Sequence, residues 1–243
     1  MKSLALNFTS FNTVRLAILS DIHEDLGRLR KVLKKIDRLG KDMSICLGDI
    51  SGFSEPYYKY RKTRNASACL ELVRDKCEII IPGNHDLHAS GKIKDPATGG
   101  REEQWDHQSD LDPGYSEEEI DFLSGLPNYR IIPNHGKGIL LSHYASPNIS
   151  GIIKGFYTRG AEFASHFQLM QENNCMLGFT GHAHVRGFYT VSSSRFSHYS
   201  YRRLYLKDFP VIVGVPPVTR HKYRSGFCIF DTDLSLLRVY KLN

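Results

Sequence analysis

One short stretch of this sequence, Ile79-Ile80-Ile81-Pro82-Gly83-Asn84-His85-Asp86, leads from an apolar run directly into three side chains that can bind metal or transfer protons. The run of β-branched residues predicts a buried strand, and the Pro-Gly pair after it predicts where that strand ends. Open α/β sheets bind ligands beyond the carboxyl ends of their strands. We therefore expect these three side chains at a ligand-binding edge of a sheet.

Four further stretches repeat this arrangement, in which a short apolar strand is followed at once by acidic or histidine side chains. These are Asp21 and His23 after residues 14–19, Asp49 after 43–47, His143 after 138–142, and His182 and His184 after 175–180. Gly48, Gly83 and Gly181 precede the polar residues of three of the stretches. We expect glycine there because a strand that turns sharply needs dihedral angles that glycine permits.

The five stretches together bring two carboxylates, one amide oxygen and five imidazoles to one place. Carboxylate and imidazole ligands suit Mn, Fe, Zn or Ni rather than Ca. Eight such groups exceed what a single ion takes, and one carboxylate can bridge two ions. We therefore expect two divalent cations, an arrangement that in phosphate-ester hydrolysis places the ions about 3.5–4 Å apart and activates water at neutral pH.

The segments between these stretches predict an α/β fold. Apolar residues at helical spacing over 26–36, with Asp25 as the N-cap, predict a helix after the first strand, and 66–74 predicts a second. This alternation of strands and helices indicates a mostly parallel sheet covered by helices. Ser116 begins a capping box before another helix. Further along, we expect a helix over 160–173 and strands over 129–133, 138–142, 175–180, 211–215, 227–231 and 236–242.

Residues 87–115 form a polar, aperiodic segment that is long for a loop inside a compact domain, so we expect it to be functional or mobile. We expect His88 and His107 within it to be solvated, and Trp105 is a candidate anchor for a lid. The sequence contains no internal repeat and no linker. Residues 1–243 are therefore predicted to form a single domain that carries this insertion.

The composition is that of a globular protein, with 41% hydrophobic and 24% charged residues in 243. No apolar run approaches the ~20 residues that span a bilayer, so we expect a cytoplasmic protein without a membrane partner. Five cysteines without C-x-x-C spacing predict reduced thiols in the core. The basic segment 186–224 could attract phosphate, nucleic acid or an anionic surface, but we favour the interpretation that it is a solvated basic hairpin.

The motifs Asp21-x-His23, Gly48-Asp49, Gly83-Asn84-His85-Asp86, His143 and Gly181-His182-x-His184 resemble the signature of the calcineurin-like metallophosphoesterase superfamily. The resemblance runs from about residue 14 to the C-terminus, and residues 115–127 are also similar to a helix of its compact bacterial and archaeal members. It implies a four-layer α/β/β/α sandwich of two mixed β-sheets. It also implies a metal-dependent phosphatase or phosphodiesterase.

The resemblance further implies a role for each motif residue. One metal ion would be held by Asp21, His23 and His184, and the other by Asn84, His143 and His182, with Asp49 bridging both. His85 would contact the substrate phosphate together with Asn84, and would donate to a non-bridging oxygen or protonate the leaving group. Asp86 would orient His85. Arg220, in a segment that departs from the pattern of the near relatives, is a candidate phosphate contact.

The activity expected from the resemblance is hydrolysis of phosphomonoesters or phosphodiesters by a metal-activated water, with Mn²⁺ as the favoured ion and Fe, Zn or Ni as alternatives. The substrate would be a small phosphate ester or a nucleotide. One alternative is a nuclease or nucleotide-polyphosphate hydrolase that uses the basic segment 186–224, where Tyr199, Tyr201 and Tyr205 alternate with arginines. The other alternative is a catalytically silent protein-interaction scaffold on the same fold.

Overall fold

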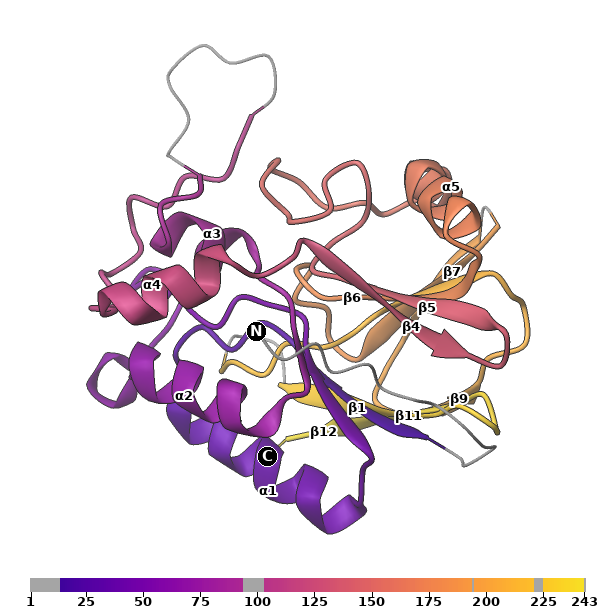
Figure 1. Cartoon of the computed structure of the whole chain (residues 1–243), viewed down its shortest axis with the longest axis horizontal. Coiled ribbons are helices and arrows are strands. Elements are labelled where there is room, and N and C mark those ends of the chain that lie inside the picture. The colour runs from indigo at the N-terminus through magenta and orange to yellow at the C-terminus, as the bar shows by residue number, and fades with distance from the viewer. Residues whose placement is uncertain (1–13, 94–102, 194, 221–224, 243) are drawn as a thin grey trace.

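The computed structural model describes residues 14–93, 103–193, 195–220 and 225–242, and it contains two six-stranded sheets packed face to face (Figure 1). The first sheet has the order β3 (Ile79–Ile80), β2 (Met43–Cys46), β1 (Arg15–Leu19), β11 (Gly226–Asp231), β12 (Leu236–Lys241) and β9 (Arg203–Tyr205). The second has the order β4 (Tyr129–Asn134), β5 (Lys137–Ser142), β6 (Cys175–Thr180), β10 (Val211–Gly214), β7 (Phe188–Ser192) and β8 (Arg195–Tyr199).

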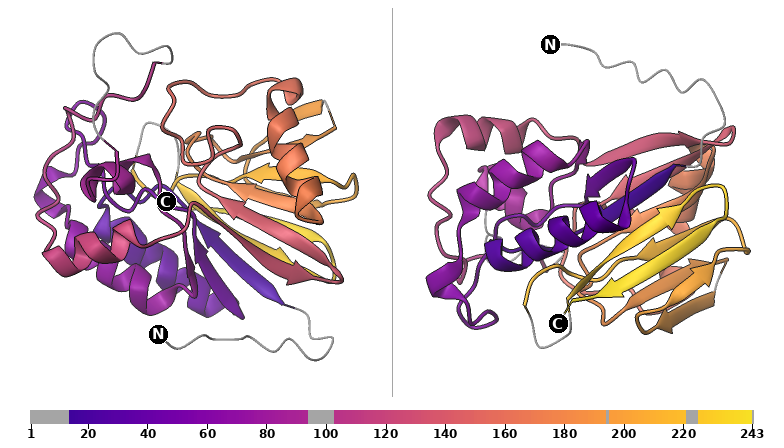
Figure 2. Two further views of the ribbon diagram at one scale, coloured as in Figure 1. Left: turned by 45° about the horizontal axis from the view of Figure 1, so that its top comes forward. Right: turned by 90° about the horizontal axis from the view of Figure 1, so that it is seen from below.

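Helices cover the outer faces of both sheets, which confirms the four-layer sandwich (Figures 1 and 2). Two helices, α1 (Leu26–Leu39) and α2 (Ala66–Lys76), pack on the first sheet. The second sheet is covered by α5 (Ala164–Glu172), which follows the 3₁₀ turn η2 (Gly160–Phe163). Two short helices lie at the ends of the insertion: α3 (Asn84–Ala89) runs into its first residues, and α4 (Glu117–Ser124) follows it. A 3₁₀ turn, η1 (Arg61–Thr63), precedes α2.

Strand β1 shows how the sequence builds the layers, because successive side chains of a strand point to opposite faces. Leu16 and Ile18 belong to the core between the two sheets. Ala17 and Leu19 belong to a second core beneath α1 and α2. A strand buried on both faces needs an unbroken apolar run, which is the pattern that predicted it.

The expected mostly parallel sheet is wrong, because the strands that close each sheet run antiparallel. In the first sheet β1, β2 and β3 are parallel, whereas β11, β12 and β9 pair antiparallel. In the second, β5, β6 and β10 are parallel and the flanking strands are antiparallel. The mixed sheets agree with the architecture that the family resemblance implied.

Most expected elements are confirmed near their predicted bounds. Asp25 caps α1 by accepting a hydrogen bond from the Arg28 amide, and Ser116 forms the capping box of α4. Strands β7 and β8 form a hairpin, but β7 carries no basic residue and is mostly buried, so the expected solvated basic hairpin is not confirmed. All five cysteines are buried free thiols. Helix α3 lies where no helix was expected. Within the described ranges, no helix is long and apolar enough to cross a membrane.

Candidate metal centre

The side chains that follow β1 and β6 form the first candidate metal group, which consists of Asp21, His23 and His184. Their ligand atoms all lie within 4.8 Å of one another. The Nε2 atom of His184 is 3.2 Å from Asp21 Oδ1 and 3.0 Å from His23 Nε2. One carboxylate and two imidazoles at this spacing could hold one cation.

The second group lies beside the first and consists of Asp49, His143 and His182. The His143 Nε2 atom is 3.2 Å from Asp49 Oδ2, and the same oxygen is 3.8 Å from His23 Nε2 in the first group. Asp49 therefore lies between the two groups. The side chain of Asn84 lines the cavity that the two groups share.

Unpaired polar atoms at this centre fit the binding of a cation. The Oδ1 atom of Asn84 and both ring nitrogens of His182 are buried without a hydrogen-bond partner among the described residues. Buried polar atoms normally have partners, so each unpaired one requires an explanation. A metal ion would supply the missing partner to an amide oxygen or to an imidazole nitrogen.

Backbone carbonyls orient two of the histidines so that Nε2 is free to bind metal. The Gly52 carbonyl lies 3.0 Å from His23 Nδ1, and the Leu47 carbonyl lies 2.6 Å from His143 Nδ1. A carbonyl oxygen can only accept, so Nδ1 donates and neutral Nε2 presents its lone pair to the centre. Metal-binding histidines are commonly oriented in this way.

Electrostatics at the centre favour neutral imidazoles at two positions and positive charge at a third. Burial lowers the pKa of His23 and of His182 to about 3, which leaves both rings free of a second proton. Burial opposes charge on His143 as well, but the nearby Asp49 carboxylate raises the pKa of that ring to about 9. The carboxylates thus favour a positive charge here, which a metal ion would provide.

The backbone is strained at five of these residues. Asp21, His23, Asp49, His182 and His184 all have φ between 47° and 65°, in the left-handed region that non-glycine residues rarely occupy. Such conformations cost about 1–3 kcal/mol each and persist where the surrounding structure enforces them. They aim successive side chains of short loops at one point.

The glycines before the ligands have two different physical reasons. Gly48 has φ +96°, as expected for a sharp turn. Gly83 and Gly181 lie outside the left-handed region, so the expected need for special dihedral angles is wrong there. A Cβ atom at Gly83 would lie 2.1 Å from Asp49 Oδ1, and one at Gly181 would lie 1.9 Å from Ser20 Oγ. These two positions need glycine because another chain segment approaches closely.

His85 lies at the start of α3, and its orienting contact differs from the one expected. Its Nδ1 atom is 2.5 Å from Asp110 Oδ2, a residue of the insertion. Asp86 instead accepts hydrogen bonds from the amides of Ile50, Ser51 and Gly83. Because Asp86 occupies the third position of α3, its carboxylate turns back to the helix N-terminus. Asp110, and not the expected Asp86, is therefore the carboxylate that contacts the His85 ring.

His107 is the second residue of the insertion that meets His85, and its expected solvation is wrong. Its side chain is 2% exposed, and its ring packs edge-on against His85 with 4.6 Å between the ring centroids. Its Nδ1 atom lies 3.3 Å from Asp110. Burial works against charge on His85, but Asp49 and Asp110 raise its pKa to about 9, so the ring can donate a proton.

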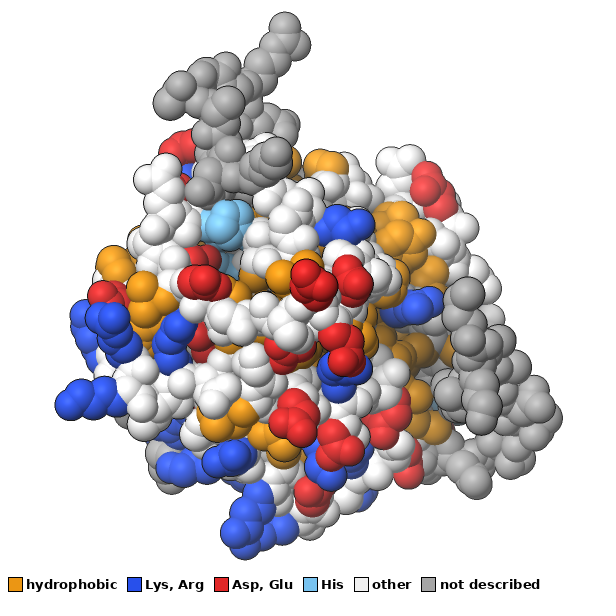
Figure 3. All heavy atoms as spheres, turned by 60° about the vertical axis from the view of Figure 1, so that its left-hand side comes forward, with side chains coloured by type: hydrophobic (Ala, Val, Ile, Leu, Met, Phe, Trp, Pro, Cys, Tyr) orange, Lys and Arg blue, Asp and Glu red, His pale blue; other side chains and the backbone are white. Residues whose placement is uncertain are grey.

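A cavity of about 400 Å³ opens over both groups. His23, Asp49, His182 and His184 of the two metal groups line it together with His85. Tyr57, Tyr58, Trp105 and Phe156 contribute aromatic rings to its walls. Figure 3 shows histidine side chains reaching the surface beside acidic ones.

Residues 103–111 of the insertion attach to both walls of this cavity. On one side Leu111 N donates to Phe53 O at 2.9 Å, and Ser54 pairs with Asp110 in a β-bridge. On the other side Trp105 N donates to Ile152 O at 3.1 Å, and Lys154 N donates to Glu103 O at 2.8 Å. Residues 94–102 of the insertion lie outside the described residues. The described part connects the loop after β2 with the loop after β5.

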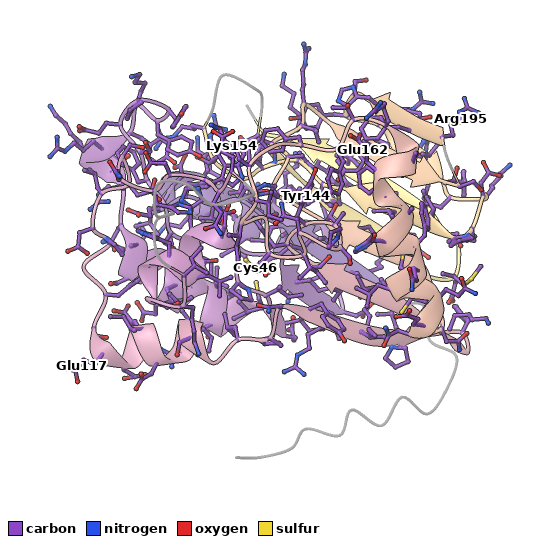
Figure 4. The ribbon with its side chains drawn as sticks, turned by 90° about the horizontal axis from the view of Figure 1, so that it is seen from above. Cys46, Glu117, Tyr144, Lys154, Glu162 and Arg195 are labelled. Carbon is purple, nitrogen blue, oxygen red and sulfur yellow. The ribbon has the colours of Figure 1, made fainter. Side chains whose placement is uncertain are left out.

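Arg220 does not line this cavity, contrary to its expected phosphate contact. Its guanidinium binds both carboxylate oxygens of Asp25, at 2.7 and 2.9 Å, and lies over the ring of Tyr60. Among the described residues of the basic segment 186–224, none lines this cavity either. In Figure 4 Arg195 lies at one end of the molecule, whereas Lys154 lies near the middle. Residues 194 and 221–224 of the basic segment are not among those described.

Comparisons with known proteins agree with this architecture. The family model described as calcineurin-like phosphoesterase matches residues 14–211. A metallophosphoesterase structure from Sphaerobacter thermophilus superposes with a TM-score of 0.70 at 23% identity, covering 96% of this chain and 89% of that one. A hypothetical protein from Pyrococcus horikoshii OT3 gives 0.64 at 15% identity, covering 95% and 88%. An uncharacterized protein of Methanocaldococcus jannaschii is 38% identical over 77 residues, which are 32% of this chain and 28% of that protein.

Proposed function

The chain belongs to the calcineurin-like phosphoesterase family, and from this membership we propose that it hydrolyses phosphomonoesters or phosphodiesters at a centre of two divalent cations. The observation that carries the proposal is the pair of adjacent ligand groups with Asp49 between them. A single cation would use one group and leave the other without a partner.

Seven side chains would hold the ions. One ion would be bound by Asp21, His23 and His184, the other by Asn84, His143 and His182, and Asp49 would bridge them. The mixture of carboxylate, amide and imidazole donors suits Mn²⁺, with Fe, Zn or Ni as alternatives. The ions, when bound, would supply the Lewis acidity that activates water and neutralises charge on the phosphoryl group.

His85 would act on the substrate rather than on the ions. Asp110 contacts Nδ1 of the ring, fixes its direction and favours its protonated form. His85 would donate a ring proton to the leaving oxygen or to a non-bridging phosphoryl oxygen. Asn84 lines the same cavity and would share the phosphate contact.

The test begins with chelator-stripped protein assayed with and without Mn²⁺ against p-nitrophenyl phosphate and bis-p-nitrophenyl phosphate. We expect release of p-nitrophenol only with metal, and the ratio of the two rates assigns the monoester or diester preference. Metal content measured in parallel should be two ions per chain. Two bound ions without turnover of either ester would contradict the proposed activity.

Asp49→Asn tests the bridge, since the amide has one oxygen where the carboxylate has two. We expect this variant to lose metal and turnover together. Asp37→Asn, the same substitution at an exposed position of α1, is the control and should retain both. Full activity of Asp49→Asn would exclude the bridging role.

A further inference from the structure

Aromatic rings stand on both sides of the metal centre, each in contact with one of its histidines. On one side Phe156 and Trp105 lie with ring centroids 5.5 Å apart, and they are 5.4 and 6.1 Å from the ring of His182. On the other side the Tyr58 ring is 5.0 Å from His23. Tyr57 lines the same cavity.

Two of these rings remain open to solvent. Tyr57 is 64% exposed and Phe156 is 45% exposed, so a ligand bound in the cavity that they line would cover them. Trp105 adds a polar handle, because its Nε1 atom is buried without an acceptor among the residues that the structure describes. A ligand with a flat ring and an acceptor atom would satisfy both conditions at once.

The charges on the cavity wall restrict what else the ligand carries. Asp106 and Asp110 both line it, beside the aromatic rings. Asp110 is paired with His85, whereas the exposed Asp106 adds negative charge to the wall. A substrate with further phosphate groups would bring like charges together here. A ring that is neutral or positively charged would not.

We propose that the substrates of this site are esters with a single phosphate whose alcohol part carries a flat aromatic ring, of about nucleoside size. This inference rests on the proposed function and names its substrate class. The ring enters between Trp105 and Phe156 on one side and Tyr57 and Tyr58 on the other, while the phosphate reaches the metal centre. The cavity of about 400 Å³ is of the size that takes small molecules, for which the range is about 300–1,000 Å³.

The experiment compares two esters that differ only in the character of the ring, benzyl phosphate and cyclohexylmethyl phosphate, or their methyl diesters if the enzyme prefers diesters. Both release a primary alcohol of similar acidity and size, so a difference reports binding of the ring. Stacking of one ring is expected to favour the benzyl ester roughly tenfold in kcat/KM. Adenosine monophosphate should likewise be a better substrate than adenosine diphosphate.

Two variants test whether the aromatic residues of the cavity cause the preference for the benzyl ester. Phe156→Leu and Tyr57→Leu keep apolar volume at exposed positions but remove a ring, and each should lower the benzyl-to-cyclohexylmethyl ratio toward one. Trp105→Phe keeps a ring and removes the N–H group, so most of the ratio should remain. Tyr205→Leu is the matched control, because that residue is 54% exposed on β9 and lies outside the cavity.

Each outcome separates the substrate class from the reaction. Turnover of both esters with equal kcat/KM overturns the aromatic preference and leaves the phosphoesterase activity standing. A benzyl preference that survives in Phe156→Leu and Tyr57→Leu also overturns it. Absence of turnover for every ester in the metal-loaded protein overturns the proposed function itself.

Discussion

Two carboxylates, those of Asp86 and Asp110, are candidates to orient His85, but only one of them contacts its ring. Asp86 follows His85 directly in the sequence, but its carboxylate oxygens accept hydrogen bonds from backbone amides. Asp110 is 25 residues away in the chain and lies 2.5 Å from Nδ1. A carboxylate at that distance fixes both the ring orientation and the nitrogen that carries the proton, as histidine partners commonly do.

Asp110→Asn should therefore reduce kcat by between about tenfold and a hundredfold, a part of the roughly 10²–10⁴-fold that general acid catalysis contributes. If the proton goes to the leaving oxygen, the loss will be larger for alkyl esters than for p-nitrophenyl esters, since p-nitrophenolate leaves without protonation. Steady-state kinetics on both ester types measure this. KM and metal content should change little.

Asp112→Asn is the control for this prediction, because Asp112 lies two residues further and caps the Gly114 amide rather than touching His85. Equal losses in the two variants would indicate a general disturbance of the insertion. An equal loss for alkyl and p-nitrophenyl esters would assign the His85 proton to a non-bridging oxygen instead.

The sequence located the candidate metal ligands at the residue scale but not the partner of His85. The ligands follow apolar strands directly, so a local rule brings them to one edge. The contact of Asp110 with His85 comes from the packing of an aperiodic segment, for which the sequence contains no repeating pattern. The burial of His107 has the same origin and the same lack of a local signal.

At the scale of elements, the loop between β5 and η2 supports the second ligand group. Asn148 closes this loop through two hydrogen bonds to the backbone of Ile153. Gly151, at φ +76°, lies so close to His182 that a Cβ atom there would be 2.6 Å from its Nδ1. The loop thus sets the position of the His182 ring from behind.

Gly151→Ala should weaken binding of the second ion by about tenfold or more, which is the usual effect of disturbing the support of a metal ligand. Titration of the chelator-stripped protein with Mn²⁺ measures the loss. Gly155→Ala is the control, because Gly155 also has positive φ, at +116°, but has open space around its Cβ position. Equal affinities in the two variants would show that the loop does not support His182.

Elements that carry their own periodicity and caps were predictable, and short ones were not. Helix α1 has Asp25 at its start and apolar residues at helical spacing. Helix α3 has six residues and begins within a ligand motif, so it offers no periodic stretch. Strand β9 has three residues at a sheet edge, which is too short for an alternating pattern to be recognised. Its pairing with β12 defines it as a strand.

For the whole molecule, the order of strands is the least local property. Strand β1 lies between β2, which follows it by one helix, and β11, which comes from near the C-terminus. The alternation of strands and helices predicts only the parallel half of each sheet. The resemblance of the motifs supplied the mixed sheets, because neither periodicity nor composition encodes which distant strands will pair.

Stability of the whole molecule should depend on pH through His166, which is buried on α5 and accepts a hydrogen bond from the Ser146 amide. Burial lowers its pKa from 6.5 to about 4. Between these values the unfolded chain takes up a proton that the folded chain does not. The contribution of His166 to stability is therefore fully present above pH 6.5 and is lost toward pH 4, by about 1.4 kcal/mol per pH unit at most.

Urea unfolding of the metal-free protein at pH 7 and pH 5 measures this dependence. In His166→Gln the loss of stability between the two pH values should be smaller by up to about 2 kcal/mol. His198→Gln, at an exposed position of β8, should show the same loss as the unsubstituted protein. An unchanged loss in His166→Gln would exclude His166 as a source of the acid sensitivity.

The attachment of residues 103–111 to both cavity walls also has an evolutionary consequence. Loops exchange readily during divergence, whereas the strand ends that carry the ligands are fixed by the sheets. This one loop segment contains both Trp105, which contributes an aromatic ring to the cavity wall, and Asp110, which contacts His85. A descendant that acquires a different segment changes its choice of substrate and the carboxylate that orients the proton donor His85 in the same step. Selection on one property therefore acts on the other.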